Sequence, residues 1–143
     1  MRILNRVMLV MLAVGAPEAR ATPTTDIFGL WMTRGDEARI EIFQCGEEIC
    51  GRIAWIPAPN NADGTAKLDV HNKDAALRGR PLVGLQLMNG FKPTGPRKWT
   101  GGTIYSARTG KTHRVTLELV GPDRLKVGKW LFGQIWRRTE QNR

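Results

Sequence analysis

The sequence is poor in the side chains that enzymes commonly use as nucleophiles, bases and metal ligands. Among 143 residues there are one serine, Ser106, and two histidines, His71 and His113. Ser106 lies beside a turn, outside the G-x-S-x-G context that exposes a nucleophilic serine. The two histidines show no recognised zinc-ligand spacing. We therefore predict no catalytic residue, no bound metal and no cofactor.

Long apolar runs are also missing. The longest, Val7 to Ala16, has ten residues, whereas a membrane-spanning helix needs about twenty. Two arginines precede this run and the A-x-A sequence Ala19-Arg20-Ala21 follows it, which is typical of a signal peptide. We predict a signal peptide over residues 1–21, a single domain over residues 22–143, and a periplasmic or secreted protein with no transmembrane segment after cleavage. A retained N-terminal anchor is the alternative.

Acidic residues are scarce relative to basic ones. The chain has 22 lysines and arginines against 13 acidic residues, a net charge of +9, and loss of the predicted leader would leave +7. Such a surplus attracts anionic partners. The basic residues are scattered and form no nucleic-acid-binding motif, so we exclude nucleic acid as a partner. An anionic envelope surface remains a candidate partner, and a generally solvated basic surface is the alternative.

The chain has two cysteines, Cys45 and Cys50, separated by Gly46-Glu47-Glu48-Ile49. This spacing fits a tight hairpin that places the two thiols on adjacent strands. A redox pair would usually show the C-x-x-C spacing, and a zinc site would need two further ligands. For an exported protein we therefore predict a structural disulfide bond between Cys45 and Cys50.

Short alternating segments separated by turns dominate the chain, and no long helix is expected. Eight or nine such segments favour a closed, antiparallel, up-and-down β-barrel, with a sandwich as the alternative. Asn89-Gly90 predicts a hairpin tip, and Gly101-Gly102 predicts a sharp bend or a close approach of another group. The five tryptophans are expected in the core. The principal strands are predicted over Ile27–Arg34, Ala38–Cys45, Ile49–Ile56, Leu82–Met88, Lys98–Ser106, Thr112–Val120, Arg124–Trp130 and Gln134–Arg138.

One long segment without a strand, from Pro57 to Pro81, interrupts this pattern. Loops of this length in small domains are usually functional. Its second half is densely charged, and Asn72 is predicted to cap a short helical turn over Lys73–Leu77.

Arg78 and Arg80 are the strongest candidates for ligand binding. Two residues apart in an extended chain, they would lie side by side, and two guanidinium groups suit a carboxylate or phosphate. The alternative is a structural role, in which both arginines pair with Asp69 and Asp74 and fix the loop to the barrel. Tyr105, beside the paired glycines, could line a cavity or simply pack with its hydroxyl satisfied.

Several short motifs follow one another in order along the chain: Gly29-Leu30-Trp31, Cys45-Gly46, Cys50-Gly51-Arg52-Ile53, Asp69 with Asn72, Arg78-x-Arg80-Pro81-Leu82-x-Gly84, Gly101-Gly102-x-Ile104-Tyr105 and Gly110-Lys111. Through these motifs the chain resembles the domain of unknown function 2147 family of small exported bacterial proteins. The resemblance implies a lipocalin-like barrel and an envelope location, and it implies no activity. At His113 the family has a tyrosine instead.

Together these features predict an all-β, lipocalin-like barrel that binds a small anionic or amphipathic ligand without catalysing a reaction. The predicted ligand-binding residues are Asp69, Asn72, Arg78, Arg80 and Tyr105. An enzyme acting on an envelope metabolite through Asp69, His71, Arg78 and Arg80 is one alternative. An envelope protein-interaction module is another. The sequence does not determine the oligomeric state.

Overall fold

The computed structural model describes residues 15, 27–129 and 131–140, so the predicted signal peptide lies outside the described residues apart from Gly15. The described chain forms ten strands and two short 3-10 helices. In chain order these are β1 (Gly29–Met32), η2 (Arg34–Asp36), β2 (Arg39–Cys45), β3 (Glu48–Trp55), η3 (Ala75–Leu77), β4 (Gln86–Gly95), β5 (Lys98–Thr100), β6 (Thr103–Ser106), β7 (Lys111–Arg114), β8 (Thr116–Gly121), β9 (Arg124–Lys129) and β10 (Phe132–Thr139).

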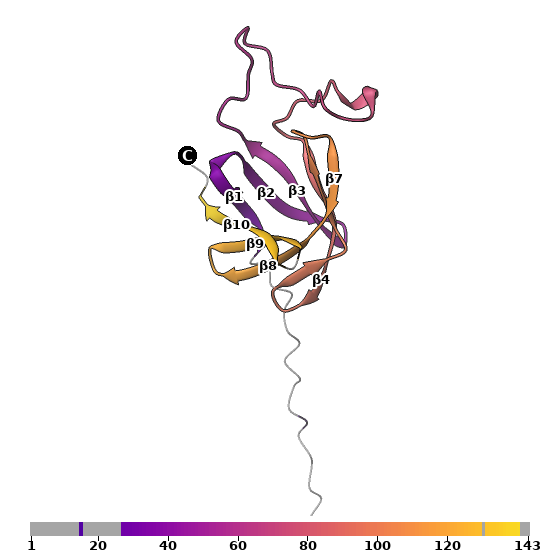
Figure 1. Cartoon of the computed structure of the whole chain (residues 1–143). Coiled ribbons are helices and arrows are strands. Elements are labelled where there is room, and N and C mark those ends of the chain that lie inside the picture. The colour runs from indigo at the N-terminus through magenta and orange to yellow at the C-terminus, as the bar shows by residue number, and fades with distance from the viewer. Residues whose placement is uncertain (1–14, 16–26, 130, 141–143) are drawn as a thin grey trace, which may run out of the picture.

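The strands form one closed, antiparallel barrel (Figure 1). β1 pairs with β2 and with β10, and a pairing between β3 and β4 completes the ring. β4 pairs with both β5 and β6, so β5 and β6 are two halves of one bent strand. β7 and β8 are likewise two halves of the next strand, because β7 pairs with β6 and β8 pairs with β5. The barrel thus has eight strands in up-and-down order, as predicted.

The bend between β5 and β6 lies at Gly101-Gly102. Gly101 has a φ of +81°, a backbone conformation that favours glycine. A Cβ atom on Gly102 would lie 2.4 Å from the ring of Phe91, so only glycine leaves room for this buried side chain. Both expectations for the paired glycines, a bend and a close approach, are therefore confirmed.

Asn89-Gly90 is not the hairpin tip that the sequence predicted. Both residues lie inside the continuous strand β4. Ile49 pairs with Phe91 and Gly51 pairs with Met88, so two residues of β4 face one residue of β3 in a β-bulge. Gly90 still has a positive φ, +80°, because a bulge can need the same backbone conformation as a tight turn. The bulge bends β4, and strand β4 begins at Gln86, later than predicted.

The barrel interior is filled by apolar side chains. Trp31, Trp99 and Trp136 are buried as predicted, and they pack with Phe91 in one core cluster. Trp55, at the end of β3, instead leaves 37% of its surface exposed. Trp130 lies outside the described residues. An eight-stranded barrel encloses enough room for side chains or for one small ligand, and here side chains occupy that space.

The up-and-down order places alternate connections at opposite ends of the barrel. At one end lie the connections β1–β2, β3–β4, β6–β7 and β9–β10. The β3–β4 connection, residues 56–85, rises from this end in Figure 1 as two lobes beyond β3 and β7. We call these residues the cap, and this end of the barrel the cap end.

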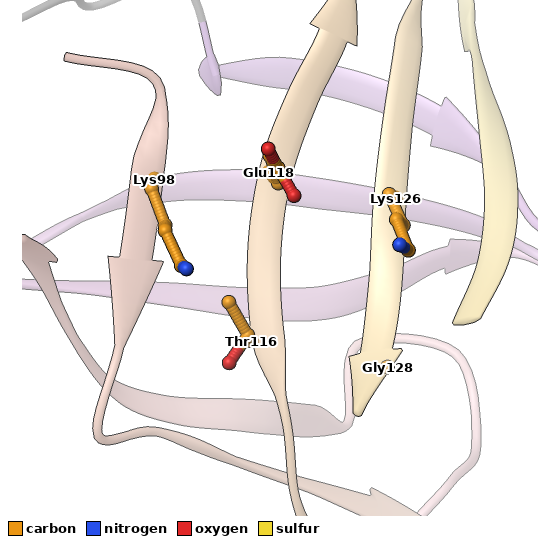
Figure 2. Close-up of a pocket in the computed structure, with 5 residues that line it drawn as sticks. All are labelled: Lys98, Thr116, Glu118, Lys126 and Gly128. Atoms are coloured by element: carbon orange, nitrogen blue, oxygen red, sulfur yellow. The ribbon is translucent and has the colours of Figure 1, made fainter. Parts of the chain in front are cut away.

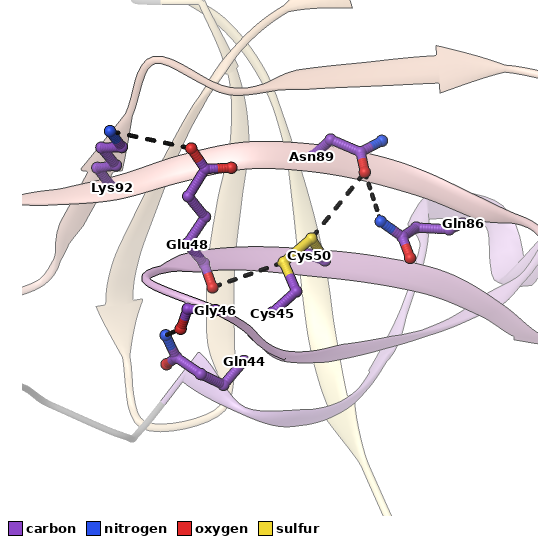
Figure 3. The surroundings of a disulfide bond; sticks show 8 residues. All are labelled: Gln44, Cys45, Gly46, Glu48, Cys50, Gln86, Asn89 and Lys92. Carbon is purple, nitrogen blue, oxygen red and sulfur yellow. Dashed lines mark hydrogen bonds and ion pairs between the residues drawn. A yellow bond between two sulfur atoms is a disulfide. The ribbon is translucent and has the colours of Figure 1, made fainter.

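A disulfide bond between Cys45 and Cys50 joins β2 to β3 at the opposite end, as predicted. Figure 3 shows it beside Asn89, whose side-chain oxygen lies 4.0 Å from the sulfur of Cys50. The bond therefore fixes the β2–β3 hairpin next to the bulge in β4. Gln44 and Glu48 flank it, and Glu48 forms a 3.9 Å ion pair with Lys92 of β4.

Candidate functional site

The cap is an ordered structure despite its lack of strands. Isolated bridges pair Asn60 with Ala66 and Leu68 with Pro81, so the cap folds back on itself twice. The amide of Asp69 donates to the carbonyl of Arg80 at 2.9 Å, which extends the second of these pairings. Within the described ranges every helix is a single three-residue turn, and none could cross a membrane.

Asp69 is the centre of the contacts that hold the cap to the barrel. Its side chain is 0% exposed, and it accepts hydrogen bonds from Tyr105 Oη at 2.6 Å, Asn72 Nδ2 at 2.8 Å and Arg80 Nη2 at 3.0 Å. Asn72 and Arg80 belong to the cap, whereas Tyr105 belongs to barrel strand β6. We call these four residues the latch. The latch joins four of the five predicted site residues and omits Arg78.

The latch keeps its carboxylate charged and its tyrosine neutral. Burial by itself would raise the pKa of Asp69, but hydrogen bonds from Tyr105, Asn72 and Arg80 outweigh burial and hold that pKa below its usual value. Burial, followed by the hydrogen bond to the Asp69 carboxylate, raises the pKa of Tyr105 to about 12. At neutral pH the Tyr105 hydroxyl is therefore a donor to an ionised carboxylate.

A glycine supports the latch from the barrel side. Gly110, in the β6–β7 turn, has a φ of +68°, and a Cβ atom on it would lie 2.0 Å from the carbonyl oxygen of His71. The cap backbone therefore rests directly on this turn. Gly110-Lys111 is one of the motifs through which the sequence resembles its family, but nothing in the sequence indicated that Gly110 would contact the cap.

The sequence predicted that Arg78 and Arg80 lie side by side on an extended chain, and this prediction is wrong. Arg78 follows η3 with helical backbone angles, φ −67° and ψ −19°, so the two side chains leave the backbone differently. The Nε atom of Arg78 donates to the carbonyl of Asn72 at 2.7 Å. In the described part of the chain, its two Nη groups have no protein partner, and the residue is exposed. The guanidinium of Arg80 forms an ion pair with the carboxylate of Asp69, whereas Arg78 faces solvent.

Asp74 does not pair with either arginine. It caps η3 instead, since its Oδ1 atom accepts from the amide of Ala76 at 3.0 Å. The predicted N-terminal helix-capping residue, Asn72, lies two residues earlier, and its Oδ1 atom accepts from the amide of Asp74 at 2.9 Å. The helical turn predicted over Lys73–Leu77 is thus shorter in the structure, where it spans Ala75–Leu77 and its N-terminal capping residue is Asp74. Of the two carboxylates that the sequence offered as arginine partners, Asp69 pairs with an arginine and Asp74 does not.

The alternative catalytic set is not assembled around Asp69. Both oxygens of Asp69 are occupied within the latch. His71 is exposed and makes no side-chain hydrogen bond or ion pair among the described residues. Within residues 27–129 and 131–140, no three histidine, cysteine or acidic side chains lie close enough together to hold a metal ion. The latch geometry suits the positioning of a loop better than proton transfer.

The cap also exposes apolar side chains beside these charges. Leu68, Val70 and Val83 of the cap expose 38%, 57% and 43% of their surface, and Trp55 lies where β3 enters the cap. Leu68 and Val70 flank Asp69 in the sequence, so apolar groups are exposed next to the latch. The cap therefore offers an apolar surface together with the free guanidinium of Arg78.

Two hollows lie elsewhere on the barrel. One, of about 190 Å³, runs across β5, β8 and β9, where Lys98, Glu118 and Lys126 lie side by side (Figure 2). The glutamate between two lysines leaves little net charge to select a ligand. The other, of about 610 Å³, is a shallow hollow on β9 and β10. Neither hollow contains a predicted site residue.

Sequence reasoning overlooked Arg138. Its guanidinium lies 4.3 Å from the centre of the Trp31 ring, and its Nη1 donates to the carbonyl of Phe28 at 2.9 Å. This cation–π contact joins the first strand to the last and so stabilises closure of the barrel. Its only sequence signal is a basic residue at the end of the last strand, a feature too common to indicate a role.

The comparisons with known proteins agree with this architecture. The family described as "Uncharacterized protein conserved in bacteria (DUF2147)" matches residues 29–143. The chain is also similar to a solved Helicobacter pylori structure described as "Protein HP1028 from the human pathogen Helicobacter pylori belongs to the lipocalin family", with a TM-score of 0.66 and 21% identity over 79% of this chain and 82% of that one. That likeness shows a lipocalin-like fold. No curated protein matches the chain. Because the family match covers most of its length, the chain belongs to the DUF2147 family.

Proposed function

We propose that the protein is exported to the periplasm or secreted, and that it binds a small anionic amphiphile at the cap end. The observation that carries this proposal is that the cap holds both a guanidinium with unoccupied Nη groups, that of Arg78, and exposed apolar side chains. Such a combination matches a ligand with one anionic group and one apolar chain. The disulfide bond supports export, because disulfides persist in oxidising compartments.

In this proposal the two arginines have different roles. Arg80 is held by the buried Asp69 and, together with Tyr105 and Asn72, positions the cap. Arg78 is tied to the cap backbone only through Nε, which leaves its Nη groups to bind the anion. The filled interior supports a ligand position on the cap surface, because the core tryptophans occupy the centre of the barrel.

The geometry favours binding over catalysis. A general acid or base must reach the substrate, and Asp69 is buried with all its contacts made inside the protein. The basic surplus also supports an anionic envelope surface as a second partner. An envelope protein-interaction module remains the alternative to both.

Calorimetric titration with laurate, an anionic amphiphile, tests the proposal. Replacing Arg78 with Gln removes the charge, and we expect laurate affinity to fall by about tenfold, as for loss of one charge-assisted hydrogen bond. The matched control is Arg97→Gln, an exposed arginine of the β4–β5 turn at the opposite end of the barrel. Equal laurate affinity in both variants, or no saturable binding by the unaltered protein, would contradict the proposal.

A further inference from the structure

The exposed large apolar side chains are unevenly distributed over the barrel. Among the described residues there are seven of them, and six lie at the cap end. The exception, Val120, lies at the end of β8, next to the β8–β9 turn at the opposite end. The six are Trp55, Leu68, Val70, Val83, Leu131 and Phe132. A monomer scatters such residues singly, so their concentration at one end indicates a contact surface.

The most exposed pair forms the tip of the β9–β10 hairpin. Leu131 exposes 72% of its surface and Phe132 exposes 88%. The hairpin below them is tightly paired, since Phe132 faces Lys129 and Gly133 faces Gly128. The tip is therefore a small apolar projection on a stable base, and burial of these side chains elsewhere would be favourable.

Exposed basic residues lie at the same end of the barrel as this projection. Lys129 lies at the base of the tip, and Lys111 and Arg114 are exposed on β7. β7 leads into β8, which pairs with β9, so these cations belong to the same end of the barrel. An apolar projection with cations at the same end of the barrel matches the chemistry of an anionic lipid surface, where the apolar groups enter the acyl boundary and the cations meet the headgroups.

We propose that the cap end docks on the surface of an anionic phospholipid bilayer, with Leu131 and Phe132 inserted as a shallow wedge. This inference gives a location to the envelope surface proposed above as a partner, but it uses residues outside the laurate site. Docking in this orientation presents the cap to the bilayer, so an amphiphile could pass between bilayer and cap without crossing water.

Co-sedimentation of the purified protein with vesicles tests the proposal. One vesicle preparation contains equal parts phosphatidylglycerol and phosphatidylcholine, and the other contains phosphatidylcholine alone. We expect binding to the anionic vesicles, weaker binding as salt concentration rises, and little binding to the neutral vesicles. The double substitution Leu131→Ser with Phe132→Ser should weaken binding by about tenfold or more, because it removes the apolar insertion. Val120→Ser, the exposed apolar residue of the opposite end, is the matched control and should bind like the unaltered protein.

Any of three other outcomes would overturn the docking proposal. The unaltered protein could fail to bind anionic vesicles, or the double variant could bind as well as the control. The protein could also self-associate through the tip, which sedimentation velocity without lipid would detect as a loss of dimer in the double variant. Thermal melting verifies that the variants are folded. Laurate titration of the double variant keeps the two proposals separate, since it should retain laurate binding even where vesicle binding is lost.

Discussion

At the scale of single residues, the contacts of Asp69 explain how a charged group can be buried at the edge of an apolar barrel. A buried carboxylate without partners would be strongly unfavourable. Here Tyr105, Asn72 and Arg80 all donate to it. Two of these donors come from the cap and one comes from the barrel, so satisfying the charge also fixes the cap in place.

Tyr105 gives a direct spectroscopic view of the latch, because it is the chain's only tyrosine. We expect the tyrosinate absorbance of the folded protein to appear with a midpoint near pH 12, against 10.0 for an ordinary tyrosine. The neutral hydroxyl therefore contributes stability below about pH 10, and this contribution is lost as pH rises through the folded pKa. Asp69→Asn should shift the midpoint back toward 10. An unchanged midpoint in that variant would show that Tyr105 does not depend on the carboxylate.

Asp69→Asn should also lower stability at neutral pH, by about 1–3 kcal/mol, because at least one buried donor loses its acceptor. The pKa of Asp69 is lowered in the folded state, so its contribution is present above the ordinary value of 3.8 and is lost as pH falls through the folded pKa. Urea denaturation at several pH values should show the gap between variant and unaltered protein closing in acid. Asp123→Asn, which removes an exposed carboxylate, should change stability by about 1 kcal/mol or less. A gap that stays constant into acid would exclude this role for Asp69.

The sequence singled out the residues of the latch, but it did not predict the orientation of Arg78. Charge density in one long loop correctly brought attention to Asp69, Asn72 and Arg80, which the structure joins in the latch. The orientation of Arg78 depends on the helical angles at the end of η3, which a two-residue spacing cannot reveal. The contact between Tyr105 and Asp69 spans 36 residues of chain, and only the closed barrel brings the two together.

At the scale of elements, the β6–β7 turn supports the cap through Gly110. Gly110→Ala should displace the cap backbone, because the new methyl group would lie 2.0 Å from the carbonyl oxygen of His71. Gly46→Ala is the matched control, since Gly46 has a similar φ, +64°, and no atom within 4 Å of the added methyl group. Both variants carry the cost of a left-handed backbone, about 1 kcal/mol or more.

Only Gly110→Ala should therefore loosen the cap. Hydrogen exchange is the measurement, with faster exchange expected at the amides of Asp69 and Asn72, which bond within the cap. The amides of the barrel core should remain protected in both variants. Equal cap exchange in Gly110→Ala and Gly46→Ala would argue that the turn does not support the cap.

Glycine-containing pairs in the sequence predicted a positive φ more reliably than they predicted whether the residues lie in a turn or inside a strand. Asn89-Gly90 indicated a positive φ correctly, but the residues form a bulge inside β4 because β3 and β6 both pair across this region. Gly101-Gly102 was interpreted correctly, since the Phe91 ring needs the space. A bulge and a hairpin tip use the same residue types, and only the pairing of distant strands distinguishes them.

At the scale of the whole molecule, the alternation of apolar residues and turns was sufficient to predict eight strands in up-and-down order, because closure leaves few other arrangements for such a pattern. It was not sufficient to predict that the interior is filled, which depends on how Trp31, Trp99 and Trp136 pack together. The filled interior and the one-sided distribution of exposed apolar residues are the reasons for proposing that ligands bind at the cap end.

Native mass spectrometry of the protein isolated without denaturation from bacterial cells is the sharpest test of ligand binding at the cap. We expect the unaltered protein and Arg97→Gln to carry an additional small anionic amphiphile, and Arg78→Gln to be isolated without it. Spectra showing only the mass of the mature chain for all three proteins, or the same bound molecule in all three, would contradict the account.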